Sequence, residues 1–284
     1  MRTILVNLEL SPVLDSVLAC ALHVGRAFDG YIEALHVRPG QPDIIAAGAD
    51  GFVAAAPDLV AGFEREARER AERARQVFEE FMATNGLQRP GSGAVSGLCA
   101  DWRIESGSAD AVLGSWGRIF DVLVVGRPLP DAVSPSMAAL ETALFEAGRP
   151  LLIAPPRPPA KLGEEVLIGW NGSTETARTV AFAMPILRRA RRIVVLSTQR
   201  GMVPGPSGAE LAHNLRRNGL EAEHREASGS DRGPGQAILE EATAMGADLI
   251  VKGAYTQSRL RQMIFGGATS HILARSELPV LMAN

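Results

Sequence analysis

Long apolar runs and cysteine are scarce in this chain, and each shortage excludes a class of protein. No apolar run approaches the roughly 18 residues that a membrane-spanning helix needs. The N-terminal MRTILVNLEL turns polar too early for the apolar core of a signal peptide. The 2 cysteines, Cys20 and Cys99, lie far apart and form no CxxC pattern, which argues against a disulfide framework or a thiolate metal site. We therefore expect a soluble cytoplasmic protein with no membrane partner.

An excess of charge of one sign is also missing. The formal net charge is −3, so the chain has no global basic field that would attract nucleic acid. Aromatic residues make up only 5% of the chain although 46% of it is hydrophobic, so Ala, Val, Leu and Gly must fill the core. Small residues let helices lie close to a sheet, which is typical of α/β layers. We expect a globular α/β protein without a nucleic-acid partner.

The chain nearly repeats itself. The first half opens with TILVNLEL and the second with EVLIGWNG, and each run leads into a helical pattern. DVLVVGRP (121–128) has its counterpart in DLIVKGAY (248–255), and GRPLLIAPP (148–156) has its counterpart in ELPVLMAN (277–284). Order and spacing agree, so duplication is the simplest explanation. The prolines of PPRPPAKLGEE (155–165) fit neither a helix nor a central strand and indicate a linker.

Short apolar runs alternate with longer helical patterns in both halves. The predicted strands are 3–8, 31–37, about 94–98, 121–126 and 150–154, then 165–170, 192–198, about 221–226, 248–253 and 279–283. Runs such as VLVV and LIV do not alternate with polar residues, as expected of parallel strands covered on both faces. Right-handed crossovers between such strands give a doubly wound sheet. We predict two units, 1–156 and 163–284.

The first unit carries an insertion between its second and third strands. Pro57 opens the predicted helix and Gly86 closes it, over 57–86. Its apolar side is marked by Phe63, Ala67, Ala74, Phe78 and Phe81, while the other side is dense in Glu and Arg. The pattern favours a solvated amphipathic helix with i,i+4 ion pairs, and a helix that binds a protein partner is the alternative.

Glycines gather where parallel strands of the second unit end. In open parallel sheets, ligands bind beyond the carboxyl ends of the strands. There the sequence has GWNGST (169–174) and GAYTQ (253–257), followed by a segment with Arg259 and Arg261 and then by Gly-Gly-Ala-Thr (266–269), where a last helix begins. Free amides and the positive end of a helix dipole favour an anion. By spacing alone, these glycines fit a phosphate cradle or ordinary turns and caps.

Taken together, the paired units, the turn WNGS, the segment DLIVKGAYTQSRLRQMIFGGATSHIL and the final LPVLMAN resemble the universal stress protein family in its tandem form. The resemblance covers nearly the whole chain and is stronger over 165–284. It implies a Rossmann-like fold of the adenine-nucleotide alpha-hydrolase type, with a five-stranded parallel sheet ordered 3-2-1-4-5 in each unit. It also implies pairing through the last strands, either as an intrachain pseudo-dimer or as a homodimer.

Members of this family that bind ATP carry Gly-x2-Gly-x9-Gly-Ser/Thr and an Asp in the turn after the first strand, which holds the adenosine end of the nucleotide. By this resemblance, Gly253 and Gly266 match the first and third glycines of the motif. Thr256 stands at the second glycine, Gly267 replaces the hydroxyl residue, and Asn171 stands in the place of the Asp. The residues expected to hold the nucleotide are Gly169, Trp170, Asn171, Thr198, Lys252, Gly253, Thr256, Gly266, Gly267, Ala268 and Thr269.

The first unit departs further from the motif. After Gly126, the chain has no glycine pair before its last helix, and Pro128, Pro130 and Pro135 remove possible amide donors. Glu9 occupies the Asp-equivalent place if the copies align without gaps. We expect no nucleotide in this unit.

Two functions remain open. The first is a regulatory protein of the stress-response type that binds ATP, with Mg²⁺, or another adenine nucleotide in its second unit. The second is a scaffold of the same fold that acts through dimerisation and protein partners. Neither catalytic residues nor a metal site can be assigned, because the histidines lack metal-like spacing and no P-loop lysine accompanies the glycines. We therefore expect no enzyme, or at most a weak ATPase.

Overall fold

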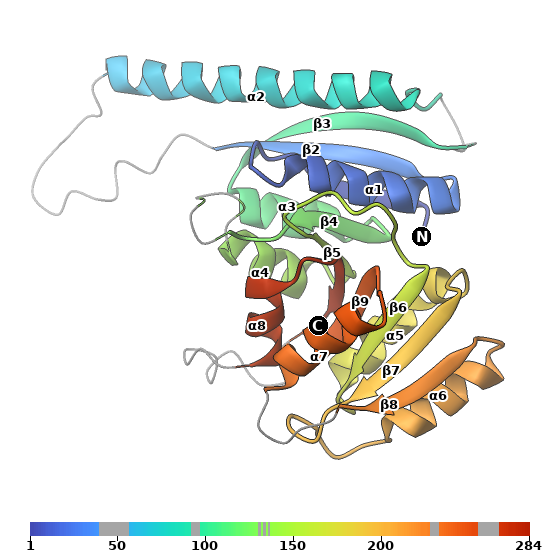
Figure 1. Ribbon diagram of the computed structural model, residues 1–284. Coiled ribbons are helices and arrows are strands. Elements are labelled where there is room, and N and C mark those ends of the chain that lie inside the picture. The colour runs from blue at the N-terminus through green and yellow to red at the C-terminus, as the bar shows by residue number, and fades with distance from the viewer. Residues whose placement is uncertain are drawn as a thin grey trace, which may run out of the picture.

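The computed structural model (Figure 1) describes residues 1–39, 57–91, 97–129, 132, 135, 137–227, 233–254 and 267–284. The first half consists of β1 (Thr3–Asn7), α1 (Leu14–Phe28), β2 (Tyr31–Pro39), α2 (Pro57–Asn85), β3 (Cys99–Gly107), α3 (Ala109–Gly117), β4 (Val122–Gly126), α4 (Met137–Glu146) and β5 (Leu151–Ala154). The second half consists of β6 (Glu165–Trp170), α5 (Thr174–Leu187), β7 (Arg192–Ser197), α6 (Gly208–Arg217), β8 (Ala222–Glu226), α7 (Pro234–Ala244), β9 (Leu249–Gly253), α8 (Ala268–Arg275) and β10 (Val280–Ala283).

These strands form a single ten-stranded sheet in the order β3-β2-β1-β4-β5-β10-β9-β6-β7-β8. Within each half the strands are parallel and follow the order 3-2-1-4-5, which confirms the predicted doubly wound α/β fold. The halves meet where β5 and β10 pair antiparallel, with Ile153 opposite Val280 and Leu151 opposite Met282. The last strand of each half is therefore paired inside the chain.

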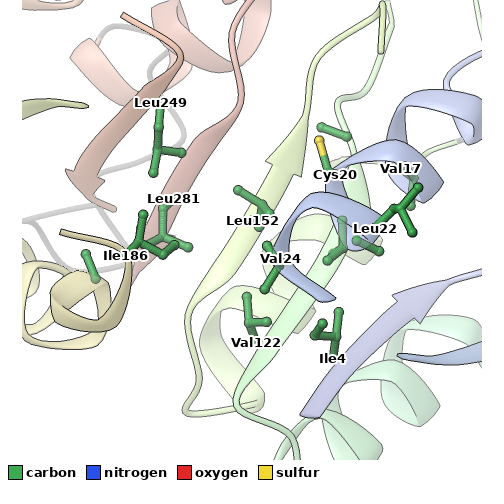
Figure 2. Close-up of a cluster of buried hydrophobic side chains, with 14 of the residues drawn as sticks. Ile4, Val17, Cys20, Leu22, Val24, Val122, Leu152, Ile186, Leu249 and Leu281 are labelled. Carbon is green, nitrogen blue, oxygen red and sulfur yellow. The ribbon is translucent and has the colours of Figure 1, made fainter. Parts of the chain in front are cut away.

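Helices from both halves cover each face of the sheet. One buried cluster joins α1, α2, α5 and α6 to the strands, and the other joins α3, α4, α7 and α8. Figure 2 shows the first cluster at the junction, where Val24 and Leu152 lie on one side and Ile186 and Leu281 on the other. The hydrophobic core therefore continues across the junction and stabilises the two halves together.

The linker between the halves lies along α1. Ser16 Oγ donates to the carbonyl oxygen of Arg157 at 3.1 Å, and His23 Nε2 lies 2.9 Å from the carbonyl oxygen of Pro159. The Arg189 guanidinium lies 5.7 Å from the ring centroid of Phe28, which adds a cation–π contact between α1 and the end of α5. These contacts give the proline-rich segment a fixed path.

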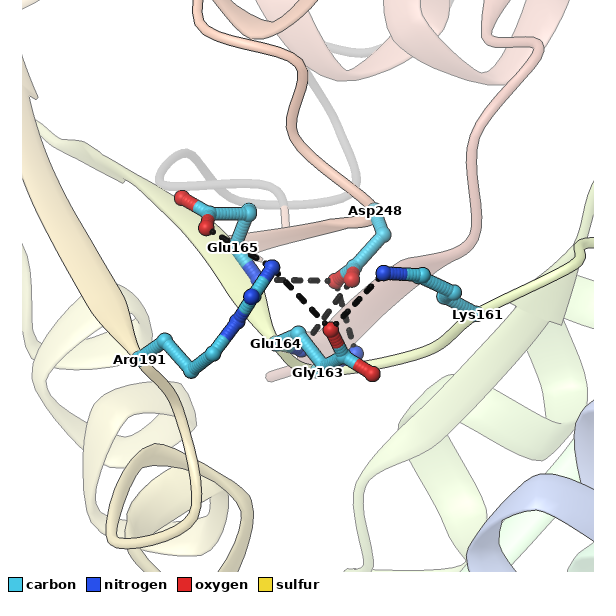
Figure 3. Close-up of polar contacts among 6 residues, drawn as sticks. All are labelled: Lys161, Gly163, Glu164, Glu165, Arg191 and Asp248. Carbon is cyan, nitrogen blue, oxygen red and sulfur yellow. Dashed lines mark hydrogen bonds and ion pairs between the residues drawn. The ribbon is translucent and has the colours of Figure 1, made fainter.

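An aspartate fixes the start of the fourth strand in each half. Asp248 accepts backbone N–H groups from Gly163 at 2.7 Å, Glu164 at 3.1 Å and Glu165 at 3.2 Å (Figure 3). In the first half, Asp121 Oδ2 accepts the N–H groups of the residues at positions 2 and 3, at 2.6 and 3.0 Å. Each carboxylate holds the beginning of the first strand against the fourth, which sets the register of the two strands that end at the candidate site.

The third strand lies later in the chain than predicted. The sequence prediction of about 94–98 falls partly outside the described residues, while β3 spans Cys99–Gly107. Gly97 has a φ of 79°, a left-handed conformation that ends any strand there. The charged residues of β3 made it look unlike a strand, because β3 is an edge strand with a partly exposed face.

The inserted helix forms as predicted, but its apolar stripe is only partly covered. Helix α2 runs alongside β2 and β3 (Figure 1), and Ala74 and Phe78 are buried there. Phe63 is 51% exposed, so the first turns of the stripe do not contact the sheet fully. Ion pairs such as Arg70–Glu66 and Arg68–Glu64 line the solvent side at i,i+4 spacing. Within the described ranges, no helix combines the length and apolar character that a bilayer crossing requires.

Candidate nucleotide site

The first strand of the second half ends in a turn that caps α5. Asn171 Oδ1 accepts the N–H of Ser173 at 3.2 Å and the hydroxyl of Thr176 at 2.7 Å. Ser173 is the N-cap of α5, and its Oγ accepts the N–H of Thr176 at 3.2 Å. The side-chain oxygen of Asn171 is therefore committed to the helix start. An aspartate would be the better acceptor here, but the amide supplies the same two bonds without charge.

Gly253, at the end of β9, lies directly beneath this helix start. A Cβ at Gly253 would lie 2.3 Å from the backbone nitrogen of Thr176 and 2.7 Å from the carbonyl carbon of Glu175. Since both neighbours are backbone atoms, only glycine fits. Gly169 is less constrained, because its Cβ would lie 2.8 Å from Cδ1 of Ile238, the far end of a side chain that can shift. Close helix–sheet packing therefore explains Gly253 without a ligand.

A buried lysine joins β9 to the first turn of α8. Lys252 Nζ donates to the carbonyl oxygen of Gly253 at 2.8 Å and to Oγ1 of Thr269 at 3.1 Å. Lys252 is 8% exposed and Thr269 is 6% exposed. Burial lowers the pKa of the Lys252 ammonium to about 8, and the charge of Glu175 acts in the opposite direction. Both acceptors are neutral, so they leave the positive charge without full compensation.

The amino end of α8 lies next to this ammonium. Gly267 is its N-cap with extended backbone, φ −147° and ψ 161°, and a Cβ there would meet no atom of the described residues within 4 Å. The helix bond from the N–H of His271 to the carbonyl of Gly267 marks the first closed turn, so the amides of the first turn, among them those of Ala268 and Thr269, have no partner within the helix. Free amides, the helix dipole and the lysine charge make this position attractive to an anion.

A loop of the same chain lies against the turn after β6. The N–H of Val203 donates to the carbonyl of Asn171 at 2.9 Å, and Trp170 Nε1 donates to the carbonyl of Pro206 at 2.8 Å. Gly172 has a φ of 79°, and a Cβ there would lie 2.9 Å from the carbonyl oxygen of Val203. Thr198 bonds within this loop, to the carbonyl of Arg200 at 2.7 Å. The loop thus occupies space beside Asn171, where the family resemblance places the adenosine.

The structure brings some of the predicted residues together and separates others. Lys252 and Thr269 are in contact, and Gly253 adjoins them. Trp170 and Asn171 contact the loop instead, and Thr198 lies in that loop. The predictions for Thr256 and Gly266, and for Arg259 and Arg261, lie outside the described residues.

The equivalent place in the first half is apolar. A Cβ at Gly126 would lie 2.4 Å from Cγ2 of Val13 and 2.7 Å from Cγ of Pro135. Val13 is 1% exposed and stands at the N-cap of α1, where it provides no side-chain capping bond. Glu9 Oε2 accepts a bond from Asn7 Nδ2 at 3.3 Å within its own turn. Apolar side chains therefore fill the position above the strand end.

The sequence analysis did not identify two sets of residues that lie near the carboxyl ends of the strands. The capping group around Ser173 and Thr176 has a signal in NGSTET, where Ser, Thr and Glu mark a helix start. Arg127, by contrast, gives no signal in GRPLP. It is 6% exposed and reaches α8 of the other half, where its Nη1 donates to the carbonyl oxygen of Leu273 at 3.2 Å and to that of Ala274.

Comparisons with known proteins agree with this architecture. The model of the universal stress protein family matches residues 164–284. The stress response protein NhaX of Bacillus subtilis is 41% identical over 49 residues, which cover 17% of this chain and 30% of that protein. The aligned part is thus less than a third of that relative's length.

Solved structures extend the likeness to the first half. A universal stress protein from Archaeoglobus fulgidus superimposes with a TM-score of 0.71 at 16% identity, covering 99% of this chain and 96% of that one. A functionally unknown protein from Pseudomonas aeruginosa superimposes with a TM-score of 0.51 at 16% identity, covering 100% of this chain and 92% of that one. These likenesses are evidence of fold. The second unit, residues 164–284, therefore matches the model of the universal stress protein family, and the first unit repeats the fold of the second.

Proposed function

We propose that the second unit binds ATP or another adenine nucleotide, and that the protein is a cytoplasmic regulator of the stress-response type without efficient hydrolysis. The observation that supports this most directly is the buried ammonium of Lys252 beside Thr269, in the first turn of α8, where the amides have no partner inside the helix. A phosphate group placed there would receive hydrogen bonds from backbone amides and compensate the lysine charge. Magnesium would accompany the phosphates from solution.

The absence of efficient hydrolysis is part of the proposal. Phosphoryl transfer requires a group that orients the attacking water and a ligand that positions the metal. In the described ranges, Glu175 is the acidic residue whose charge acts on Lys252, and it lies in the first turn of α5. One carboxylate in a helix start supplies neither arrangement. Nucleotide would therefore be retained rather than consumed, as suits a protein whose bound state is read by a partner.

The first test is isothermal titration of the purified chain, stripped of bound nucleotide, with ATP and Mg²⁺. We expect a Kd in the micromolar range, about −8 kcal/mol, with roughly one site per chain. Two sites would show that the first unit also binds, despite Val13 and Pro135 over Gly126. No heat at high ATP concentration would exclude the nucleotide proposal.

A change at Gly267 separates binding from folding. Because a Cβ at Gly267 would meet no atom among the residues that the structure describes and the backbone is extended, both Gly267→Asp and Gly267→Asn fit as N-caps. The aspartate favours the helix dipole but repels phosphate, so we expect an unchanged or slightly higher Tm and an ATP affinity lowered by at least about tenfold. The asparagine is the matched control and should bind within about threefold of wild type.

Calorimetry and thermal unfolding of the same two variants check this expectation. If Gly267→Asp and Gly267→Asn bind ATP equally well, the phosphates do not lie at the start of α8. That result would leave the nucleotide proposal without its supporting site.

One observation favours the alternative, a scaffold that acts through protein partners. The bonds from Val203 to Asn171 and from Trp170 to Pro206 keep a loop against the turn where adenosine is expected. A nucleotide would have to displace this loop or bind beside it. If titration shows no ATP binding, this closed loop is the physical reason, and dimerisation and pull-down experiments become the relevant measurements.

A further inference from the structure

Arg127 belongs to the first half but contacts the helix of the proposed phosphate site. It follows β4 directly, at the strand end where apolar side chains lie over Gly126. Its side chain crosses the junction of the halves to the last turn of α8. The two ends of α8 therefore face different halves, because Thr269 at the amino end contacts Lys252 of β9.

The contacts of Arg127 suit the carboxyl end of a helix. Nη1 donates to the carbonyl oxygens of Leu273, at 3.2 Å, and of Ala274, while Nη2 lies 3.9 Å from Oε1 of Glu277. The last carbonyls of a helix have no partner inside it and carry the negative end of its dipole, so a guanidinium both bonds and neutralises them. Arg127 is 6% exposed, and in the described part of the chain its Nε has no hydrogen-bond partner.

Burying an arginine with an unsatisfied nitrogen lowers the stability of the fold, so the presence of Arg127 at this place needs a compensating interaction. An apolar residue would fill the same volume without desolvating a charge. The cost is offset if the bonds to α8 fix a helix that would otherwise be loose. Helix α8 has 8 residues, and helices of this length are marginal without tertiary contacts.

We propose that Arg127 is a positioning residue for the nucleotide site of the second unit: it holds the carboxyl end of α8 so that the amides at the amino end stay ordered for phosphate. A residue at the end of the fourth strand of the first unit thus supports the proposed site of the second unit. This inference rests on the proposed function for its binding part, whereas its structural part, the ordering of α8, is independent of any ligand.

The experiment compares Arg127→Met with Arg275→Met in the full-length chain. Arg275 lies in the same last turn of α8 but is exposed, so its loss removes a charge without removing the buried bonds to the carbonyls. Amide hydrogen exchange of 268–275 and titration with ATP and Mg²⁺ are measured well below each variant's Tm. Arg127→Lys is the conservative variant, because it keeps the charge and can donate to one carbonyl.

For Arg127→Met we expect exchange across α8 to rise roughly tenfold and ATP affinity to fall roughly tenfold, since hydrogen bonds from a charged donor are lost. We expect Arg275→Met to stay within about twofold of wild type and Arg127→Lys to recover part of both losses. Equal exchange in the two Met variants would overturn the proposal. So would faster exchange with unchanged affinity, because α8 order would then not matter to the ligand.

The two proposals fail in distinguishable ways. If wild type binds no ATP while Arg127→Met still loosens α8 selectively, the nucleotide function is wrong and the positioning role of Arg127 is lost with it, although the helix contact is real. If wild type binds ATP and Arg127→Met binds equally well, only the positioning role is wrong.

Discussion

The fourth strand ends in opposite ways in the two units. In the first, Gly126 lies beneath the apolar side chains of Val13 and Pro135. In the second, Gly253 lies beneath the backbone of α5, and the buried residue before it is Lys252 where the first unit has Val125. Both units have the same strand order although only the second has a polar residue, Lys252, directly before the last glycine of the strand. The fold therefore does not require a polar residue there. The proposed anion site of the second unit therefore depends on a few side chains at the strand end and not on the fold.

The largest expected effect comes from adding a methyl group at each glycine. Gly253→Ala forces its Cβ against the backbone of Thr176, so we expect a loss of about 3 kcal/mol in the free energy of unfolding. Gly126→Ala presses on side chains instead and should cost less, about 2 kcal/mol, because side chains shift more easily than backbone. Truncation of Val13 to Ala in the same chain should remove part of that cost. Urea unfolding of both single variants and of the Val13→Ala, Gly126→Ala pair measures these values. A pair no more stable than Gly126→Ala alone would contradict the difference that we infer.

The second prediction concerns the lysine that distinguishes the units. The pKa of Lys252 is lowered to about 8 in the folded state from 10.5, so between these values the unfolded state holds more protons. The contribution of Lys252 to stability therefore rises with pH across that window, by on the order of 3 kcal/mol at most. Lys252→Met should lack this rise, and urea unfolding at about pH 7.5, 9 and 10.5, which starts just below the window and ends at its upper limit, would reveal the difference.

The quantity to compare is the difference in the free energy of unfolding between wild type and Lys252→Met at each pH, because the other titrating groups are common to both proteins. Burial also raises the pKa of the Cys20 thiol, to about 12, and its effect on stability has the opposite sign. If the free energies of unfolding of the two proteins change in parallel with pH, the pKa of Lys252 is not lowered in the folded state and this prediction is wrong.

The smallest effect should come from the two aspartates at the strand starts. For Asp121, burial raises the pKa, but the backbone amides that donate to it outweigh burial and lower the pKa overall. Its contribution to stability is present above the unfolded pKa and is lost as the pH falls through the folded pKa. For Asp248, burial dominates over three amide bonds and raises the pKa. Its contribution is present in acid and is lost as the pH rises through the folded pKa.

Carboxyl NMR titration of wild type, with Asp121→Asn and Asp248→Asn for assignment, checks the two directions. A pKa of Asp248 below its ordinary value would show that its three bonds from backbone amides, and not its burial, control its ionisation.

The sequence predicted the fold because each unit contains its own periodic signals. Unbroken runs such as VLVV identified the central strands, and Pro57 and Gly86 bracketed α2. Strand β3 was misplaced because edge strands carry charged residues, so the short apolar run before Gly97 looked more like a strand.

The candidate site was harder to predict than the fold. Lys252 and Thr269 were expected near the ligand, but their contact depends on the packing of β9 against α8, which no local pattern encodes. Gly253 fits the phosphate motif, yet its nearest neighbour is the backbone of Thr176, so a motif glycine can have a packing role. Arg127 and Leu273 are more than a hundred residues apart along the chain, and only the tertiary structure brings them into contact.

The antiparallel pairing of β5 with β10 also has an evolutionary consequence. In a symmetric dimer of identical subunits, every substitution occurs twice, so a lost site is lost in both copies. Here the partner strand is tethered in the same polypeptide, at an effective concentration that needs no assembly from dilute subunits. One copy can then diverge freely while the other remains under selection. The two units do differ at this position, because the side chain of Val13 lies over Gly126 whereas the backbone of Thr176 lies over Gly253.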